Sequence, residues 1–261
     1  MSNPFVARAD APPSPLRAAV NYLLVCLIVV LVFWVSLSAA NVTFSFGFIG
    51  KYHIRIVDGF LLTIWLSVCS LVLSLLLGTL VAVGQSVGFL PVRYLCDLYV
   101  KVIRGTPLLV QIYLFYYIIG TAWGISSRVV MGVLILSVFE GAYIAEIIRG
   151  SLLSLDQTQL ESARAVGFTR AQSIRYVVLP QMVARTLPGL TGQFASVIKD
   201  SSLLSVIAVI EITQSLREIS AATFQLFETM LLLGALYLVL TLPLMFVSRV
   251  FERRFNYARQ A

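Results

Sequence analysis

Residues 150–187 read GSLLSLDQTQLESARAVGFTRAQSIRYVVLPQMVARTL and form the one long polar interruption late in an otherwise apolar chain. Residues 160–166 are typical of a short helix, and Gly167 predicts its end because glycine tolerates the left-handed conformation that follows a helix. Thr169 can cap a second helix, which Pro180 would end or bend. The stretch therefore predicts two short helices joined at a glycine, although an ordinary cytoplasmic loop would also fit its composition.

The composition of the whole chain places it in a lipid bilayer. Hydrophobic residues make up 59% of the 261 residues, charged residues only 12%, and the mean hydropathy is +0.93. A soluble domain of this length could not bury so much apolar surface. The formal net charge of +7 does not require nucleic acid as a partner, because positive residues in a membrane protein usually mark its cytoplasmic loops.

Neither the cysteines nor the histidine predict a metal site or a catalytic group. Cys26, Cys69 and Cys96 lie in or beside apolar runs, without the spacing of metal ligands or of a disulfide framework. His53 has no His, Cys or acidic cluster near it, which favours an ordinary surface histidine.

Six apolar segments are long enough to cross a hydrocarbon core of about 30 Å, which needs about 20 residues. The predicted spans are residues 20–40, 59–83, 94–120, 129–148, 187–210 and 230–250. The polar ends, residues 1–19 and 251–261, are predicted tails. Because a polar tail precedes it, the first span is interpreted as a retained helix, with a cleaved signal as the alternative.

The connections between these spans carry further signals. Residues 104–107, RGTP, interrupt the third span, where Thr106 can cap the half-helix that Pro107 begins. Residues 41–58 are predicted to form a loop outside the membrane. Residues 211–228 are too polar to span and are placed outside as well, where they can contain an interfacial helix.

The orientation follows from the distribution of lysine and arginine. With the N-terminus inside, most of these residues fall in inside segments. The exceptions are Lys51, Arg55, Arg128 and Arg217, which fall outside, and Lys199, which falls within a span. The bias predicts a multi-pass membrane protein with both termini and the polar stretch in the cytoplasm.

The polar stretch also resembles a known motif. Glu161, Ala163 and Gly167 are followed, after nine residues, by the sequence VVLP that ends at Pro180. This pattern resembles the EAA loop of ABC importer permeases, E-A-A, G and I-x-L-P, with Ser162 in place of the middle Ala and Val177 in place of Ile.

Three further motifs occur in the expected order. RGTPLLVQ at residues 104–111 resembles the same run in polar amino-acid ABC permeases. AYIAEIIRG at residues 142–150 is similar to their AYxAExxRG, and KDSSL at residues 199–203 to their KDTSL, with Ser201 in place of Thr. Together these motifs are specific for the subfamily, but they do not identify the amino acid.

The resemblance implies an all-α integral membrane protein of about six transmembrane helices. A type I ABC permease core at residues 59–250 would contain five helices and the coupling loop at residues 150–187, and residues 20–40 would add an N-terminal helix. The chain would be the transmembrane subunit of an ATP-driven importer of polar amino acids in the bacterial inner membrane. Its partners would be ABC ATPase subunits, an identical or sister permease subunit and an extracytoplasmic solute-binding protein, together with membrane lipid.

The lysines agree with a separate ATPase. A phosphate-binding loop needs G-x-x-x-x-G-K-[ST], and none of Lys51, Lys101 and Lys199 lies in that context. The chain is therefore predicted to be no enzyme and to hold no cofactor, with ATP and Mg²⁺ bound by the partner subunit. The main alternative is an ion-coupled secondary transporter, which would carry more intramembrane carboxylates. A membrane-embedded enzyme would need a cluster of His, Cys or acids within the spans.

The candidate site residues form two groups. The resemblance implies that Glu161, Ser162, Ala163, Gly167, Leu179 and Pro180 contact the ATPase. A charge in the centre of a span costs roughly 2.5–3.5 kcal/mol and therefore usually faces the interior of the bundle. The candidate substrate pathway consists of Glu140, Tyr143, Arg104, Gln111, Lys199, Asp200 and Ser202.

Glu140 could receive the ammonium group of an amino acid, and Lys199 or Arg104 its carboxylate. Gly141 would let another helix or a ligand approach closely. Other interpretations remain open: Lys199 and Asp200 could pair with each other, and Arg104 could only anchor its helix at the headgroups. Glu146 and Arg149, three residues apart, suit an ion pair on a helix surface.

Overall fold

The computed structural model describes residues 14–39, 44–155 and 157–257, and the chain divides into two compact units, Met1–Ser45 and Phe46–Ala261. The first unit contains helix α1 (Pro15–Ala39), which is predominantly apolar and has no buried residue. This helix begins within the segment predicted as a tail. Most of that tail, residues 1–13, and the last residue of the predicted first span lie outside the described residues.

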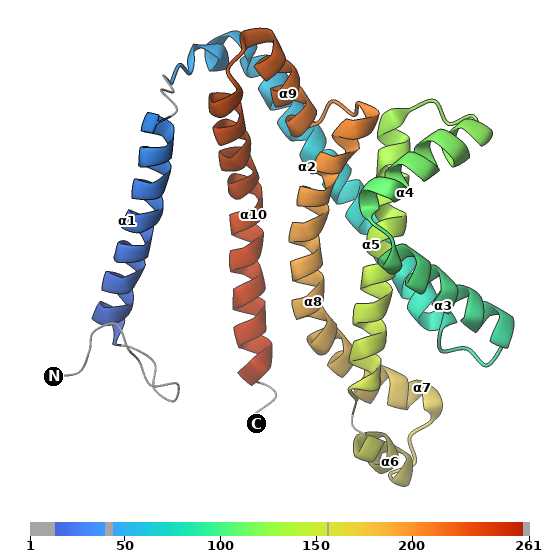
Figure 1. The fold of residues 1–261 in the computed structure, drawn as a ribbon. Helices are drawn as coiled ribbons and strands as arrows, with labels where there is room; N and C mark the ends of the chain where they lie inside the picture. The colour runs from blue at the N-terminus through green and yellow to red at the C-terminus, as the bar shows by residue number, and fades with distance from the viewer. Residues whose placement is uncertain (1–13, 40–43, 156, 258–261) are drawn as a thin grey trace. The chain divides into compact units, whose positions relative to one another are not determined.

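The second unit is helical wherever it has regular structure in the described ranges (Figure 1). Two of its segments, η1 and η2, are π-helical, and η3 is a 3₁₀-helix. The elements are α2 (Gly47–Gly84), α3 (Leu90–Gly105), α4 (Leu108–Leu114), η1 (Phe115–Gly120), α5 (Arg128–Leu153), α6 (Gln157–Ala165), α7 (Arg170–Ser173), η2 (Ile174–Val178), α8 (Leu179–Asp200), η3 (Ser201–Ile207), α9 (Ile212–Thr223) and α10 (Leu226–Tyr257).

Helices α2 and α5 pack closely because small residues line their contact. A Cβ added at Gly78 of α2 would lie 2.7 Å from Cγ2 of Ile144 and 2.8 Å from the carbonyl oxygen of Gly141. Nearby, Ser70 of α2 donates a hydrogen bond to the carbonyl of Val133 in α5, at 3.4 Å. Small residues of this kind let two helix backbones approach within a membrane.

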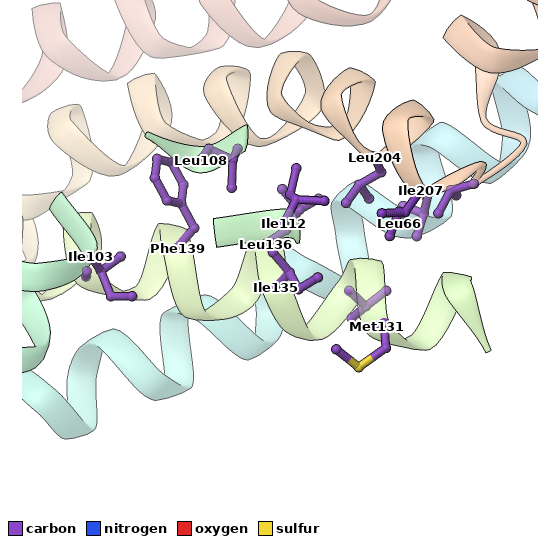
Figure 2. Packing of buried hydrophobic residues seen from close by; sticks show 13 residues of the cluster. Leu66, Ile103, Leu108, Ile112, Met131, Ile135, Leu136, Phe139, Leu204 and Ile207 are labelled. Carbon is purple, nitrogen blue, oxygen red and sulfur yellow. The ribbon is translucent and has the colours of Figure 1, made fainter. Parts of the chain in front are cut away.

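The largest buried cluster joins the broken helix α3–α4 to this pair. Figure 2 shows Leu108 and Ile112 of α4 beside Phe139 and Leu136 of α5. Leu66, from α2, meets side chains of η3 in the same cluster. Helix α8 lies between α5 and α10 (Figure 1).

Among the described residues, four helices are long and apolar enough to cross a membrane: α1, α2, α5 and α10. Helix α3 and the segment α4–η1 meet at a bend of 112°, and they form a fifth span if the two together are counted as one crossing. Helix α8, the predicted fifth span, is not among them because it is amphipathic. The predicted class, an all-α integral membrane protein, is confirmed, with the helix count approximate.

Three predicted boundaries were wrong. Residues 47–58, predicted as a loop, form the first turns of α2. The predicted span at residues 187–210 is divided, since α8 ends at Asp200 and η3 follows until Ala208, whose φ of +55° ends the helical run. Helix α10 continues to Tyr257, into the segment predicted as the C-terminal tail, and residues 258–261 lie outside the described residues.

Candidate functional site

Glu140 lies in α5 and is fully buried, with 0% of its surface exposed. The side-chain amide of Gln193, from α8, donates a hydrogen bond to its Oε2. Asp200, the last residue of α8, lies beside the same carboxyl group. Within the described parts of the chain, Oε1 of Glu140 has no hydrogen-bond partner. Because a buried polar atom without a partner is costly, this oxygen is suited to receive a donor, either a proton shared with the Asp200 carboxyl or a group of a ligand.

The remaining predicted residues of this region lie where α8 meets η3. Lys199 is exposed and lies within electrostatic range of the Asp200 carboxyl. Ser202 is half-buried in η3. The structure thus brings Asp200 from α8 to Glu140 in α5.

A second cluster, which contains charged side chains of α3 and α5, lies further along α5, beginning at Tyr143, one helical turn after Glu140. The Arg104 guanidinium, at the end of α3, lies over the ring of Tyr143, 5.3 Å from its centroid. It also pairs with Glu146, with 3.4 Å between Nη1 and Oε2. Arg149 donates two hydrogen bonds to Glu146, which confirms the predicted pair of these two residues. Arg104 is thus held by side chains of α5.

The side chain of Gln111 in α4 is hydrogen-bonded across the break between α3 and α4. Its Nε2 donates to the carbonyls of Ile103, at 2.7 Å, and Thr106, at 3.1 Å, and to the hydroxyl of Thr106, at 2.8 Å. The prediction that Thr106 caps α4 was wrong. Pro107 occupies the capping position, and the Thr106 hydroxyl donates instead to the Val102 carbonyl. The reason is that the end of α3 leaves carbonyl groups that need donors.

Helices α6 and α7 form the predicted pair of short helices joined at a glycine. Gly167 has a φ of +85°, and its N–H donates to the Arg164 carbonyl at 3.0 Å. The N–H of Phe168 donates to the Ala163 carbonyl at 3.0 Å, which completes a glycine-terminated helix end. The next helix is capped by Thr169, as predicted, through reciprocal bonds with Gln172.

Figure 1 shows α6 and α7 beyond the C-terminal end of α5. On α6, Glu161 and Ser162 are exposed, whereas Ala163 is buried. Leu179 and Pro180 are exposed at the start of α8. Pro180 does not end the preceding helix, because the chain passes from η2 directly into α8, where the missing N–H falls in the first turn.

Other contacts of this site were not predicted from the sequence. The Gln181 amide donates to Gln159 of α6 at 2.5 Å, and Arg185 donates to the hydroxyl of Ser154 at 2.9 Å. These bonds attach α6 and the end of α5 to α8. The contact of Gln193 with Glu140 was also not predicted. Its only sequence signal is an amide in an amphipathic helix, and no neighbouring residue in the sequence indicates Glu140 as its partner.

Comparison with known proteins agrees with this architecture. Residues 74–257 match the family model described as "Binding-protein-dependent transport system inner membrane component". The glutamine transport system permease protein GlnP of Escherichia coli (strain K12) is 36% identical over 202 residues, 76% of this chain and 92% of that protein. The probable glutamine ABC transporter permease protein GlnM of Bacillus subtilis (strain 168) is 34% identical over 214 residues, 82% and 97% of the two chains.

Solved structures show the same fold. A chain from the crystal structure of an amino acid ABC transporter with histidines superimposes with a TM-score of 0.76 at 33% identity, covering 82% of this chain and 100% of that chain. An inward-facing structure of the MetNI methionine ABC transporter gives a TM-score of 0.62 at 17% identity, covering 81% and 99%. At that identity the second likeness concerns the fold alone.

The fold and its break at α3–α4, with the α6–α7 segment, define a membrane-embedded permease of the type I ABC class. This chain belongs to the family of binding-protein-dependent transport system inner membrane components. It is the multi-pass transmembrane subunit of an ABC amino-acid importer and is not itself an enzyme, since ATP is hydrolysed by the partner ATPase. Membership of the family implies an ATPase and a substrate-binding protein as partners.

Proposed function

We propose that this chain translocates polar amino acids across the inner membrane through a site centred on Glu140. The observation that carries the proposal is the fully buried Glu140 carboxyl of α5, which lies beside the Asp200 carboxyl of α8. Similar proteins support the substrate class, because two of them are named for glutamine and one solved transporter is described with histidines.

In this proposal Glu140 receives the α-ammonium group of the substrate. Asp200 lies beside Glu140, so that the ammonium meets carboxyl groups from both α5 and α8. Arg104 receives the α-carboxylate, because it lies over Tyr143, one helical turn from Glu140 on the same face of α5. Lys199 and Ser202 remain candidates for the outer part of the same pathway. Gln111 supports the site indirectly, since its amide holds the break beside Arg104.

The α6–α7 segment would transmit movement from the ATPase. Exposed Glu161 and Ser162 are available to a partner, and Gly167 sets the direction in which the chain leaves α6. Leu179 and Pro180 would complete this contact at the start of α8. ATP and Mg²⁺ would be bound by the ATPase, and rigid-body movement of the helices would alternate access to the site.

The orientation and the other partners also belong to the proposal. The distribution of lysine and arginine supports a cytoplasmic location for both termini and α6–α7 and an outside location for α9. This orientation requires the amphipathic helix α8 to cross the membrane as a sixth span. A solute-binding protein would deliver the amino acid on the α9 side. A second permease subunit, identical or related, would complete the pore.

The deciding experiment is uptake of a panel of labelled polar amino acids into vesicles that contain the permease, its ATPase and its binding protein. Glu140→Gln is expected to weaken uptake or change its selectivity, because the substituted amide has no charge to pair with an ammonium. Asp97→Asn is the matched control: Asp97 accepts a hydrogen bond from Gln85 at 2.9 Å, and an asparagine oxygen can still accept it. If Glu140→Gln transports the same panel with unchanged kinetics, Glu140 is not a substrate ligand, and Tyr143 and Ser202 become the next candidates.

A further inference from the structure

The Glu146 carboxylate contacts two guanidinium groups, one through two hydrogen bonds and the other through a single ion pair. Arg149, three residues away on the same helix, donates two hydrogen bonds to its two carboxyl oxygens. Arg104, which reaches it from α3, makes an ion pair of 3.4 Å to one oxygen. Arg104 can therefore leave Glu146 without leaving that carboxylate unpaired.

The pair of Arg104 and Glu146 is also partly exposed at the surface of this chain. The exposed fractions of the two side chains are 40% and 28%, and ion pairs with such exposure contribute about 0.2–1 kcal/mol. The ring of Tyr143 holds the Arg104 guanidinium from a second side through a cation–π contact. Breaking the ion pair would thus be easy and would leave Arg104 in place over the ring.

The order of these groups along α5 matches the two ends of an amino acid. Tyr143 lies one turn from Glu140 and one turn from Glu146, and exposure rises from 0% at Glu140 to 28% at the Glu146 side chain. A substrate with its ammonium group at Glu140 would extend along Tyr143 and present its carboxylate to Arg104. In the structure the carboxylate that Arg104 meets is that of Glu146.

We propose that Glu146 stands in for the substrate carboxylate, and that binding exchanges the Arg104–Glu146 pair for a pair between Arg104 and the amino acid. The inference rests on the proposed function of Glu140. Glu146 is then a positioning residue: it keeps Arg104 directed along α5 while the site is empty, and Arg149 retains Glu146 when the substrate arrives. It also lowers the affinity, because the substrate must compete with it.

The test uses the complex of permease and ATPase in lipid nanodiscs without the binding protein. Direct binding of labelled L-glutamine and L-histidine is compared with binding of their α-amides, which lack the carboxylate. Glu146→Gln should bind the amino acids roughly 1.4- to fivefold more tightly, the range expected for a lost exposed ion pair. Its affinity for the amides should not change.

A double-mutant cycle separates exchange from a general effect of charge. Arg104→Gln should weaken binding of the amino acids, and adding Glu146→Gln in that background should have no further effect. A purely electrostatic field from Glu146 would still act when Arg104 is absent. A second variant, Arg149→Gln, should bind the amino acids more weakly, the opposite of Glu146→Gln. Without Arg149, Arg104 is the remaining guanidinium of the two that hold Glu146. This variant keeps the test decisive if Glu146→Gln does not fold.

The proposal is overturned if Glu146→Gln leaves amino-acid affinity unchanged or weakens it, tightens the amides equally, or retains its effect with Arg104→Gln. It is also overturned if Arg149→Gln binds the amino acids as the unaltered protein does. Failure of the proposed function looks different. In that case the unaltered complex binds neither amino acid, or binds them with an affinity that Glu140→Gln does not change.

Discussion

The α6–α7 segment and the surroundings of Glu140 are held by contacts of very different range along the chain. In α6–α7, Gly167 bonds to the carbonyl of Arg164 and Thr169 to Gln172, all within one turn. Glu140 instead bonds to Gln193, 53 residues away on another helix. A substitution in the segment should therefore change that segment alone, whereas one at a helix interface should change the whole membrane-embedded unit.

The largest expected effect is that of Gly78→Leu in α2. A Cβ at this position would lie 2.8 Å from the Gly141 carbonyl oxygen, so α2 and α5 must move apart. Overpacking of this kind costs about 3 kcal/mol. We expect a lower melting temperature of the purified permease and loss of substrate binding, because Glu140 is adjacent to Gly141. Thermal unfolding in detergent measures the first effect.

Gly50→Leu is the matched control, since it makes the same change in the same helix at a position where an added Cβ meets nothing within 4 Å. Its melting temperature should stay close to that of the unaltered protein. Equal destabilisation by both substitutions would show that leucine in α2 is unfavourable in itself. The close contact with α5 would then not be the cause.

The same difference in range decides how far the sequence predicts the structure. The helix end at Gly167 and the cap at Thr169 were predicted correctly because each depends on residues within one turn. The bent helix at Arg104–Pro107 was predicted for the same reason, although its capping residue was not. Thr106 turns its hydroxyl back to Val102 because Gln111, from the next helix, supplies the other donor to the end of α3.

The environment of Glu140 could be predicted only in part. An acid in an apolar span indicates an inward-facing position, and Glu140 is indeed fully buried. Its neighbours follow from the packing of α8 against α5, which no short motif encodes. Residues 47–58 were misassigned for a related reason: their polar side chains suggested a loop, but Ile56 packs against α9 and stabilises a helix there.

Gly167→Val tests the local side of the comparison. Valine is strained at the φ of +85° that Gly167 adopts, at a cost of roughly 1–3 kcal/mol. An added Cβ there meets nothing within 4 Å, so the effect should come from the backbone alone. We expect normal insertion and normal melting of the membrane-embedded helices, but reduced copurification of the ATPase and loss of uptake. Asparagine tolerates this conformation better than valine, so Gly167→Asn should retain much of the ATPase copurification and of the uptake. Full transport by Gly167→Val would contradict a role of this turn in coupling.

The smallest expected effect is that of Thr169→Ala, which removes one cap from α7. The Thr169 hydroxyl accepts a hydrogen bond from the Gln172 N–H at 3.3 Å, and the loss of such a cap typically costs about 1 kcal/mol. Because that contact lies within one turn, the cost should appear as local opening. Amide hydrogen exchange in α7 should become about fivefold faster, whereas exchange in α5 and the melting temperature should not change. Thr169→Ser, which keeps the hydroxyl, is the control and should exchange as the unaltered protein does. Faster exchange in α5 as well would show that the α6–α7 segment is not energetically independent of the membrane-embedded helices. The bonds of Gln181 to Gln159 and of Arg185 to Ser154 would then be the contacts that couple the two regions.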